Sequence, residues 1–278
     1  MEKYLIVDGS NLLFQMFYGM PARIFNKDGK AIQGTLGFVG ALLKTLRRVR
    51  PSHVAVLFDG ETENPRRSLD ADYKANRPDL SQEEETPFSQ LPDVYRALDY
   101  LGLCHKETEC CEADDWMAAY AKALGKEAEV VLLSQDSDLF QLITSSVRVL
   151  RYRGEHSILC DEAYIREKLG ISPAQYADFK SLTGDHSDNI KGAPKVGPKT
   201  AAALMQEFGN LENLLENAER VQKPSVRASL LESRERLRKN YALIHLTGQE
   251  PLPFSPEVLR YEDKGLTTTQ VLEAIGLR

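Results

Sequence analysis

The sequence lacks the features that membrane proteins and disulfide-rich secreted proteins need. It has only four cysteines and no CxxC pair, and the neighbours Cys110 and Cys111 are poorly placed to bridge each other. No apolar run approaches the length that spans a bilayer, and no basic leader precedes the apolar segment at the N-terminus. We therefore expect reduced thiols, no membrane partner and a cytoplasmic location.

A surplus of positive charge is also missing, which at first argues against nucleic acid as a partner. The formal net charge is −6, from 35 Lys and Arg against 41 Asp and Glu, whereas phosphate binding depends on cations that neutralise the backbone. Carboxylates that gather at one site to hold metal ions would, however, make the total acidic while another surface stays basic. The distribution of charge along the chain therefore decides between these interpretations.

What is present is the composition of an ordinary folded protein. Hydrophobic residues make up 42% and charged residues 27% of the 278 positions, with no internal repeat or low-complexity tract. Three apolar segments predict buried strands that each end in an aspartate, namely YLIVD (4–8), HVAVLFD (53–59) and VVLLSQD (130–136). Helical patterns alternate with them at residues 37–50, 89–101 and 113–124. This alternation predicts an α/β fold with a mostly parallel sheet flanked by helices.

Acidic side chains recur at the ends of these strands and at the starts of later elements. The ligand crevice of a parallel α/β sheet lies at the carboxyl ends of its strands, so Asp8, Asp59 and Asp136 should meet there. A single such acid is more often a helix cap, but the whole set comprises Asp8, Asp59, Glu112, Asp114, Asp115, Asp136, Asp138, Asp185 and Asp188. Carboxylates brought together repel one another and raise one another's pKa unless cations neutralise them. We therefore expect a metal site.

The type of ligand narrows the choice of metal and of reaction. Sites made of carboxylate oxygens suit Mg²⁺ or Mn²⁺, whereas zinc prefers His and Cys, and the five histidines share no motif. Two Mg²⁺ ions close together suit phosphodiester hydrolysis, because one activates water and the other stabilises the leaving oxygen. We therefore expect two divalent cations, Mg²⁺ with Mn²⁺ as a substitute, and hydrolysis of a phosphodiester bond.

A short basic helix is predicted soon after the second strand, at residues 66–77. An Asn-Pro pair supplies an N-cap with proline at the first helical position, and a second proline follows the last turn. On such a helix Arg66, Tyr73 and Arg77 share one face, with Lys74 beside them. A charged face is more often simply solvated, but its position in the chain allows these cations to reach a phosphate held at the metals.

The last third of the sequence predicts helices separated by turns. The strand signal fades after about residue 153, and helical patterns follow at residues 161–169, 173–182, 199–208 and 232–246. A stretch rich in Gly, Pro and Lys, residues 184–200, opens this part of the chain. We place a domain boundary near Leu182.

The end of that stretch is a candidate phosphate clamp. Gly197 precedes a helix start and exposes backbone N–H groups to an anion, Lys195 and Lys199 add positive charge, and Thr200 follows in the first turn. A short loop of glycine and proline is more often a simple turn, so both interpretations stay open.

Seven motifs in a fixed order resemble the flap endonuclease and 5′-3′ exonuclease family, which includes the N-terminal exonuclease domain of bacterial DNA polymerase I. The resemblance covers nearly the whole chain through VDGSN (7–11), LFDG (57–60), DYKANRP (72–78), EADD (112–115), SQDSDLFQL (134–142), GDHSDNI (184–190) and VGPKTA (196–201). It implies a PIN-like nuclease domain over residues 1–182 with a helical arch near residues 63–90. Residues 183–278 would form a helix-hairpin-helix module that binds duplex DNA.

The resemblance also implies a role for each motif residue. The first metal would be bound by Asp8, Asp59, Glu112 and Asp114, and the second by Asp136, Asp138, Asp185 and Asp188. Asp115 would have a supporting role. Lys74 and Arg77 would act at the scissile phosphate, and Arg66 and Tyr73 would contact DNA near the arch through which a single-stranded 5′ flap passes.

The hairpin and two departures complete the comparison with the family. Lys195, Gly197, Lys199 and Thr200 would hold the duplex, where relatives often bind K⁺. Gln15 stands where polymerase-linked relatives have an arginine, which puts one phosphate contact in doubt, and Lys195 replaces the first of two usual glycines, where a positive φ would be strained.

From these residues we expect a stand-alone, monomeric bacterial nuclease that acts on DNA with a 5′ flap or a 5′ end, including RNA-DNA primer junctions. It would leave a 5′-phosphate and associate with the nucleoid when bound to DNA. Two alternatives remain, a structure-specific DNA-binding protein without catalysis and a PIN-type ribonuclease. The ribonuclease would explain only the first half of the chain.

Overall fold

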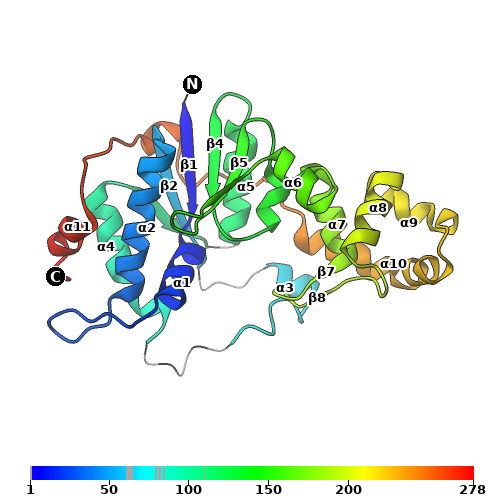
Figure 1. The fold of residues 1–278 in the computed structure, drawn as a ribbon, viewed down its shortest axis with the longest axis horizontal. Coiled ribbons are helices and arrows are strands. Elements are labelled where there is room, and N and C mark those ends of the chain that lie inside the picture. The colour runs from blue at the N-terminus through cyan, green and yellow to red at the C-terminus, as the bar shows by residue number, and fades with distance from the viewer. Residues whose placement is uncertain (1, 61–64, 79, 81–82, 84, 110) are drawn as a thin grey trace.

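A six-stranded sheet organises the first part of the computed structural model, which describes residues 2–60, 65–78, 80, 83, 85–109 and 111–278 (Figure 1). Its strand order is β3-β2-β1-β4-β5-β6, and the strands are β1 (Lys3–Asp8), β2 (His53–Phe58), β3 (Cys104–Glu107), β4 (Glu129–Leu133), β5 (Val147–Arg151) and β6 (Ile158–Cys160). Neighbouring strands are parallel except β5 and β6. The predicted mostly parallel sheet is confirmed.

Alternation along β1 explains why helices cover both faces of the sheet. Tyr4 and Ile6 pack into one hydrophobic cluster, and Leu5 and Val7 into the other, because successive strand residues point to opposite faces. The first cluster includes α5, and the second includes α1, α2, α4 and α11. Their bounds are α1 (Gly9–Gly19), α2 (Gln33–Val49), α4 (Leu91–Leu101), α5 (Ala113–Leu124) and α11 (Thr268–Ala274).

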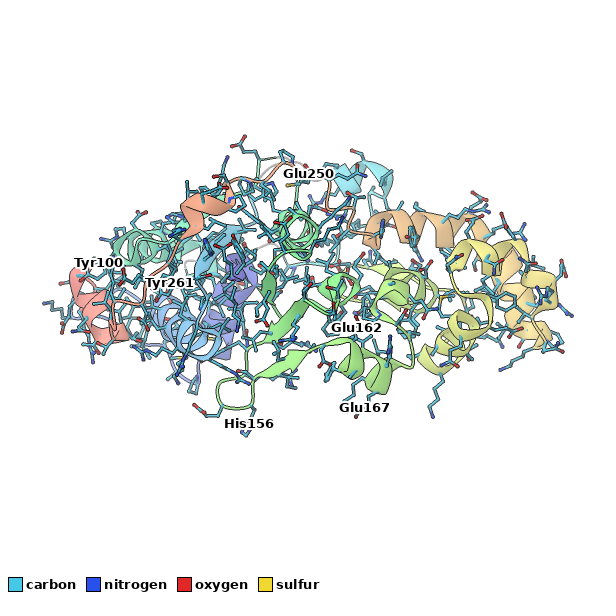
Figure 2. All side chains as sticks on the ribbon, turned by 90° about the horizontal axis from the view of Figure 1, so that it is seen from above. Tyr100, His156, Glu162, Glu167, Glu250 and Tyr261 are labelled. Carbon is cyan, nitrogen blue, oxygen red and sulfur yellow. The ribbon has the colours of Figure 1, made fainter. Side chains whose placement is uncertain are left out.

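A group of helices extends from the sheet at the end opposite α11, as Figure 2 shows from above. It comprises α6 (Glu162–Leu169), α7 (Tyr176–Thr183), α8 (Pro198–Phe208), α9 (Leu211–Glu216) and α10 (Pro224–Ile244), with the short hairpin β7 (Gly184–Asp185) and β8 (Ile190–Lys191) between α7 and α8. Helix α7 packs against α8 and α10. The chain then returns to the sheet, where Arg260 forms a bridge with His53 before α11. Short 3₁₀ turns lie at Pro87–Gln90, Asp138–Leu142, Pro173–Gln175, Ala218–Arg220 and Pro256–Leu259.

The prediction of a basic helix over residues 66–77 is wrong. Helix α3 covers only Pro65–Leu69, and turns follow. Asp70 ends the helix because its side chain accepts a hydrogen bond from the backbone N–H of Asp72, which favours a turn over a further helical turn. Lys74 then adopts a positive φ of 56°. The expected Asn cap, at residue 64, lies outside the described residues.

The structure also contains more strands than the sequence analysis predicts. Strand β3 forms without a clear apolar alternation, β5 is short, with the sequence VRVLR, and β6, β7 and β8 lie beyond residue 153, where the pattern predicts helices and turns alone. Within the described residues, no helix combines the length and apolar character needed to cross a membrane.

Candidate metal and nucleic-acid site

Asp8 anchors one group of acids at the carboxyl end of β1. It caps α1 by accepting a hydrogen bond from the Asn11 N–H at 2.9 Å, and its other oxygen accepts one from the Ser134 hydroxyl at 2.8 Å. Burial, and then the neighbouring Asp59 carboxylate, raise its pKa to about 7, with a further contribution from Asp136. The carboxylates of Asp59 and Asp136 therefore both lie close enough to Asp8 to repel it, and a cation beside Asp8 would relieve this repulsion.

The start of α5 brings a second set of acids beside Asp59. An Asp59 oxygen accepts a hydrogen bond from the Ala113 N–H at 2.9 Å, and Glu112 and Asp115 form a reciprocal capping box around the first turn. Asp114 is half-buried, with 17% of its side chain exposed, and burial and then Glu112 raise its pKa well above the ordinary value. One buried Asp114 oxygen has no hydrogen-bond partner among the described residues, and its ion pair with Arg66 is long, at 3.9 Å. A buried acceptor in this state fits a site for a cation.

Two cations from the segment after β2 lie on these acids. The buried Arg66 guanidinium binds Asp115 through two hydrogen bonds of 2.6 and 2.9 Å and Glu112 through one of 2.7 Å, and its Nε donates to the Leu243 carbonyl of α10. The Lys74 ammonium also pairs with Glu112. Arg66 thus lies against acids of the motif set, with 9% of its surface exposed.

Tyr73 and Arg77 connect this segment to the acids of the hairpin. The buried Tyr73 hydroxyl is 3.1 Å from a Glu112 oxygen and 3.4 Å from an Asp188 oxygen. Arg77 pairs with Asp188 at 3.2 Å with more than half of its side chain exposed, and the Lys74 N–H donates to the Asp188 carbonyl. The turns after α3 therefore bring Tyr73, Lys74 and Arg77 to the acids, as α3 itself does for Arg66.

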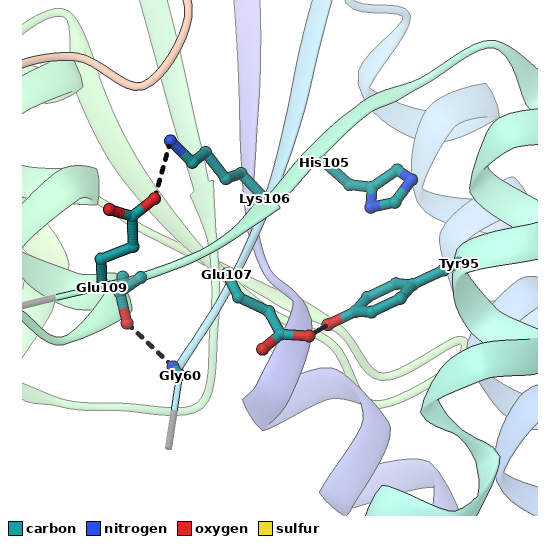
Figure 3. A pocket seen from close by; sticks show the side chains of 7 residues that line it. Gly60, Tyr95, His105, Lys106, Glu107 and Glu109 are labelled. Atoms are coloured by element: carbon teal, nitrogen blue, oxygen red, sulfur yellow. Dashed lines mark hydrogen bonds and ion pairs between the residues drawn. The ribbon is translucent and has the colours of Figure 1, made fainter. Parts of the chain in front are cut away.

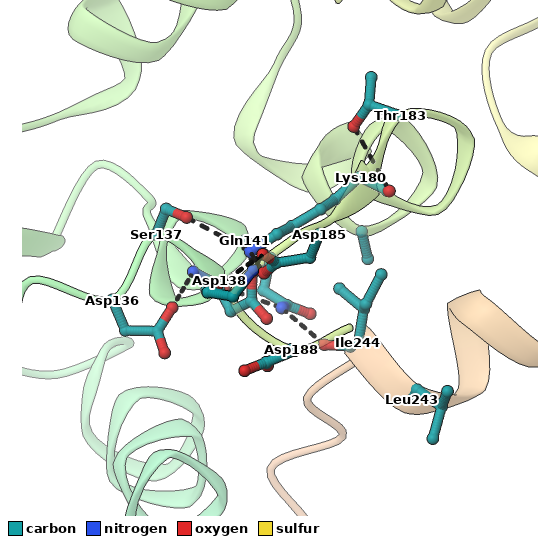
Figure 4. A network of polar contacts seen from close by, with 12 residues as sticks. Asp136, Ser137, Asp138, Gln141, Lys180, Thr183, Asp185, Asp188, Leu243 and Ile244 are labelled. Atoms are coloured by element: carbon teal, nitrogen blue, oxygen red, sulfur yellow. Dashed lines mark hydrogen bonds and ion pairs between the residues drawn. The ribbon is translucent and has the colours of Figure 1, made fainter. Parts of the chain in front are cut away.

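The acids of the second group lie close together (Figure 4). Asp138, Asp185 and Asp188 each offer an oxygen, and these oxygens all lie within 4.8 Å of one another. The Asp138 N–H donates to Asp136 at 2.8 Å, which ties Asp136 to this group. Gly184 makes the approach possible, because a Cβ there would lie 2.5 Å from the Ile190 oxygen and the Gly192 nitrogen. Oxygen-only ligands at this spacing suit Mg²⁺ or Mn²⁺.

Lys180 is a member of this group that the sequence analysis does not identify. Its buried ammonium pairs with Asp138 and, at 2.6 Å, with Asp185. Burial raises the pKa of Asp138 to about 7 although the ammonium opposes the shift, whereas the ammonium outweighs burial at Asp185 and lowers its pKa. A signal does exist, because Lys180 lies in the apolar helical stretch just before the GDHSDNI motif.

The four acids expected at the first metal do not close to the same spacing as the second group. Among the described residues, the only cluster whose oxygens meet within 4.8 Å is that of Asp138, Asp185 and Asp188. Glu112 instead accepts hydrogen bonds from Arg66, Tyr73 and Lys74. The first set of acids therefore lies at the carboxyl edge of the sheet, and Arg66 and Lys74 pair with it there.

The candidate DNA-binding residues of the predicted helix-hairpin-helix module lie at the start of α8 and just before it. Gly197 caps this helix, Lys195 and Lys199 are exposed, and Thr200 is half-buried in the first turn. Lys195 has a φ of 65°, the conformation that favours glycine. At the other departure, the Gln15 amide donates to the Tyr152 carbonyl at 2.8 Å, so its side chain is held against the end of β5.

A hollow of about 450 Å³ lies apart from the acids, beside Gly60 and β3 (Figure 3). Tyr95 and Glu107 meet across it, and Lys106 pairs with Glu109 at its edge. The motif acids are not among its lining residues. Glu107 accepts a hydrogen bond from Tyr95, His105 contacts Asp99, and Lys106 pairs with Glu109, so we assign the chemistry to the motif acids.

Comparison with known proteins gives a consistent result over almost the whole chain. The family described as "5'-3' exonuclease, N-terminal resolvase-like domain" matches residues 3–170, and "5'-3' exonuclease, C-terminal SAM fold" matches residues 171–266. The thermostable DNA polymerase I of Thermus aquaticus is 36% identical over 251 residues, which are 90% of this chain and 29% of that protein. The chain spans less than a third of the curated relatives that it matches first.

Solved structures agree with this result. The T5 D15 protein co-crystallised with metal ions aligns with a TM-score of 0.70 at 25% identity, covering 88% of this chain and 90% of that one. A complex of a T5 D15 flap endonuclease variant with DNA and metal ions aligns with a TM-score of 0.72 at 22% identity, covering 99% of both chains. These findings confirm the resemblance carried by the seven motifs, with a resolvase-like α/β part followed by a helical one. The two family matches meet after residue 170, and the boundary near Leu182 stays a prediction.

Proposed function

Because the chain belongs to the 5′-3′ exonuclease family, we propose that it is a structure-specific 5′ nuclease that hydrolyses DNA phosphodiester bonds and leaves a 5′-phosphate. The observation that carries this proposal is the convergence of Asp138, Asp185 and Asp188 within 4.8 Å, next to the exposed cation Arg77. Acids at this spacing can hold a divalent cation, and the neighbouring cation can hold a phosphate.

Two divalent cations, Mg²⁺ with Mn²⁺ as a substitute, fit the oxygen donors of the site. The first would be held by Asp8, Asp59, Glu112 and Asp114, with Asp115 in support, and the second by Asp136, Asp138, Asp185 and Asp188. Bound there, the cations would supply an activated water and stabilise the charge of the leaving oxygen. The raised pKa of Asp8 and of Asp114 is consistent with the proposal, because burial first, and then a neighbouring carboxylate, Asp59 or Glu112, disfavours the charged form of each acid while no cation is bound.

Lys74, Arg77 and Tyr73 would position the scissile phosphate. In the structure each of them pairs with an acid of the site, either Glu112 or Asp188. An ammonium, a guanidinium and a phenol supply donors to phosphate oxygens. Arg66 is more deeply buried and pairs with Asp115 in bidentate geometry. It would therefore affect DNA binding indirectly, by holding the segment that carries Tyr73, Lys74 and Arg77 in place.

The helical part, residues 183–278 in our proposed division, would bind the duplex behind the cut. Lys195, Lys199, Thr200 and the N–H groups that follow Gly197 stand at the start of α8, where a helix N-terminus favours anions, and K⁺ could bridge the hairpin to a phosphate. The natural substrate would be DNA with a 5′ flap or 5′ end, including RNA-DNA primer junctions. The role would be primer and flap removal in replication and repair, by a monomer in the cytoplasm that joins the nucleoid on DNA.

The test is cleavage of a 5′-labelled flap duplex beside a blunt duplex and a single-stranded RNA of the same sequence, with Mg²⁺, Mn²⁺ or chelator. We expect metal-dependent cutting that is faster on the flap, with a 5′-phosphate at the new end. Release of the flap as one oligonucleotide identifies endonuclease action, and release of mononucleotides identifies exonuclease action. Binding of the flap in Ca²⁺ without cutting in Mg²⁺ would favour a non-catalytic DNA-binding protein, and a preference for single-stranded RNA would favour a PIN-type ribonuclease.

A further inference from the structure

Lys180 places a permanent positive charge inside the second group of acids. Its side chain extends from the middle of α7, and only 10% of it is exposed. The ammonium pairs with one oxygen of Asp138 and one of Asp185, and it lies 3.4 Å from the Ser137 hydroxyl. Figure 4 shows the lysine pointing into the space between these two carboxylates. Two of the three converging acids therefore already share a cation that belongs to the protein.

The ammonium lies against two of the three carboxylates that a metal ion would need. Asp138, Asp185 and Asp188 can bind one ion through oxygens that lie within 4.8 Å of one another, and the lysine contacts two of the three. Two cations cannot share this volume, because their repulsion rises steeply at short distance. A metal ion that binds there has to displace the ammonium or bind with fewer ligands.

The fold keeps Lys180 close to the acids. Helix α7 packs against α8 and α10, and the Lys180 ammonium lies 5.9 Å from the centre of the Tyr176 ring, one turn earlier on the same helix. A group tethered in this way competes at a fixed local concentration, which dilution of the protein does not change. The first group of acids differs, since its partners Arg66 and Lys74 come from the segment after β2.

We propose that Lys180 is a resident counter-ion of the second metal position, which weakens binding of the second divalent cation and makes its entry depend on displacement of the ammonium. The inference rests on the proposed function, because the excluded ion is the one assigned to catalysis. It goes further in stating that the second cation binds weakly and in naming Lys180 as the side chain that opposes it. It also gives Lys180 a role without metal, which is to neutralise Asp138 and Asp185.

Calorimetric titration with Mn²⁺ alone tests this proposal on the full chain without DNA. We compare the wild type with Lys180→Met, which keeps the length of the side chain and removes the charge, and with Lys168→Met as the matched control. Lys168 is an exposed lysine of α6 whose partner is Glu167. The only tryptophan of the chain, Trp116, follows Asp115 in α5, so its fluorescence reports separately on the first cation.

The proposal predicts that Lys180→Met binds the second Mn²⁺ about tenfold more tightly or better, since no ammonium has to leave. Lys168→Met should match the wild type, and the change in Trp116 fluorescence should occur at the same Mn²⁺ concentration in all three proteins. Adding Asp185→Asn to Lys180→Met should abolish the gain, which locates it at this group of acids.

Two results would overturn the proposal, and each has a different meaning. Two bound Mn²⁺ ions with a second affinity that is unchanged or weaker in Lys180→Met would make Lys180 a structural partner of the acids, with the proposed function intact. Absence of Mn²⁺ binding in every protein would contradict the proposed function itself. If Lys180→Met does not fold, Lys180→Gln and Lys180→Arg replace it, with tighter second binding expected for Gln and wild-type binding for Arg.

Discussion

Two groups of acids meet at the carboxyl edge of the sheet, and each is neutralised from a different part of the chain. Glu112 and Asp115 pair with Arg66, and Glu112 also with Lys74, which come from the segment after β2. Asp138 and Asp185 pair with Lys180, which comes from a packed helix next to them.

The difference teaches how one edge can hold many carboxylates before any metal binds. The first group depends on a segment that folds back across the site and is fixed to α10 through the Arg66 contact with the Leu243 carbonyl. The second group depends on a helix packed directly beside the acids, since α7, β7 and the 3₁₀ turn at Asp138–Leu142 are neighbours. The first should therefore respond to changes in the segment after β2, and the second to changes in α7.

The largest expected effect is on stability, from Arg66→Met. The substitution leaves the buried acids Glu112, Asp114 and Asp115 without the guanidinium, and breaking a buried ion pair from one side costs about 3–5 kcal/mol. Urea unfolding in the presence of chelator measures the loss. The neighbouring Arg67→Met is the control, because Arg67 is exposed and should change stability by less than about 0.5 kcal/mol. Equal effects of the two substitutions would remove Arg66 from the account.

The next effect is on catalysis, from Asp138→Asn. Loss of a carboxylate from the second group should lower the single-turnover rate on the flap substrate on the order of 10²- to 10³-fold, since metal assistance contributes several kcal/mol to the transition state. Asp161→Asn is the matched control. Asp161 caps α6 away from the site, and asparagine caps a helix equally well. A wild-type rate for Asp138→Asn would contradict the assignment of the second group.

The third prediction concerns how the free energy of unfolding depends on pH, measured with and without bound metal. Asp8 and Asp138 each have a pKa raised from 3.8 to about 7, so the folded state holds protons that the unfolded state releases. Their contribution to stability is therefore present below pH 3.8 and is lost as the pH rises to about 7. We expect urea unfolding in chelator to show a decline across this window, superimposed on the other titrations, and saturating Mg²⁺ to reduce it. A decline of the same size with and without Mg²⁺ would separate these acids from the metal site.

The smallest expected effect comes from Lys195→Gly in the hairpin. Glycine relieves the positive φ of 65° at a gain of about 0.5–1 kcal/mol in stability, after the entropy that glycine adds to the unfolded chain. It also removes one cation, so the slope of log affinity for duplex DNA against log salt should become shallower by about 1. An unchanged slope would show that Lys195 does not contact phosphate.

The acids could be found from the sequence because the signal is local. Each of Asp8, Asp59 and Asp136 follows an apolar strand, and parallel strands bring such ends together. The predicted helix over residues 113–124 matches α5 in both bounds, since the EADD motif supplies its own capping box. The placement of acids at strand ends and helix starts can therefore be predicted from one sequence.

The cations that pair with these acids, Arg66 and Lys180, cannot be predicted from the sequence in the same way. Arg66 contacts Asp115 across 49 positions and Lys180 contacts Asp138 across 42, and no local pattern reports a pairing at that range. The turn after α3 has a local signal in Asp70 and Asp72, which favour turns, but the charged face of a helix outweighed it. Strand β3 is half-exposed and carries His105, Lys106 and Glu107, so it has no apolar alternation to detect.

The central claim is that this edge of the sheet holds two divalent cations of unequal affinity. Crystals grown with flap DNA and soaked in increasing Mn²⁺ test it most directly, because the anomalous scattering of Mn²⁺ locates each ion. The account predicts one peak among Asp8, Asp59, Glu112 and Asp114 at low Mn²⁺, and a second among Asp136, Asp138, Asp185 and Asp188 at higher Mn²⁺ with the Lys180 ammonium moved away. A single peak at every concentration, or a second peak with Lys180 still between Asp138 and Asp185, would contradict it.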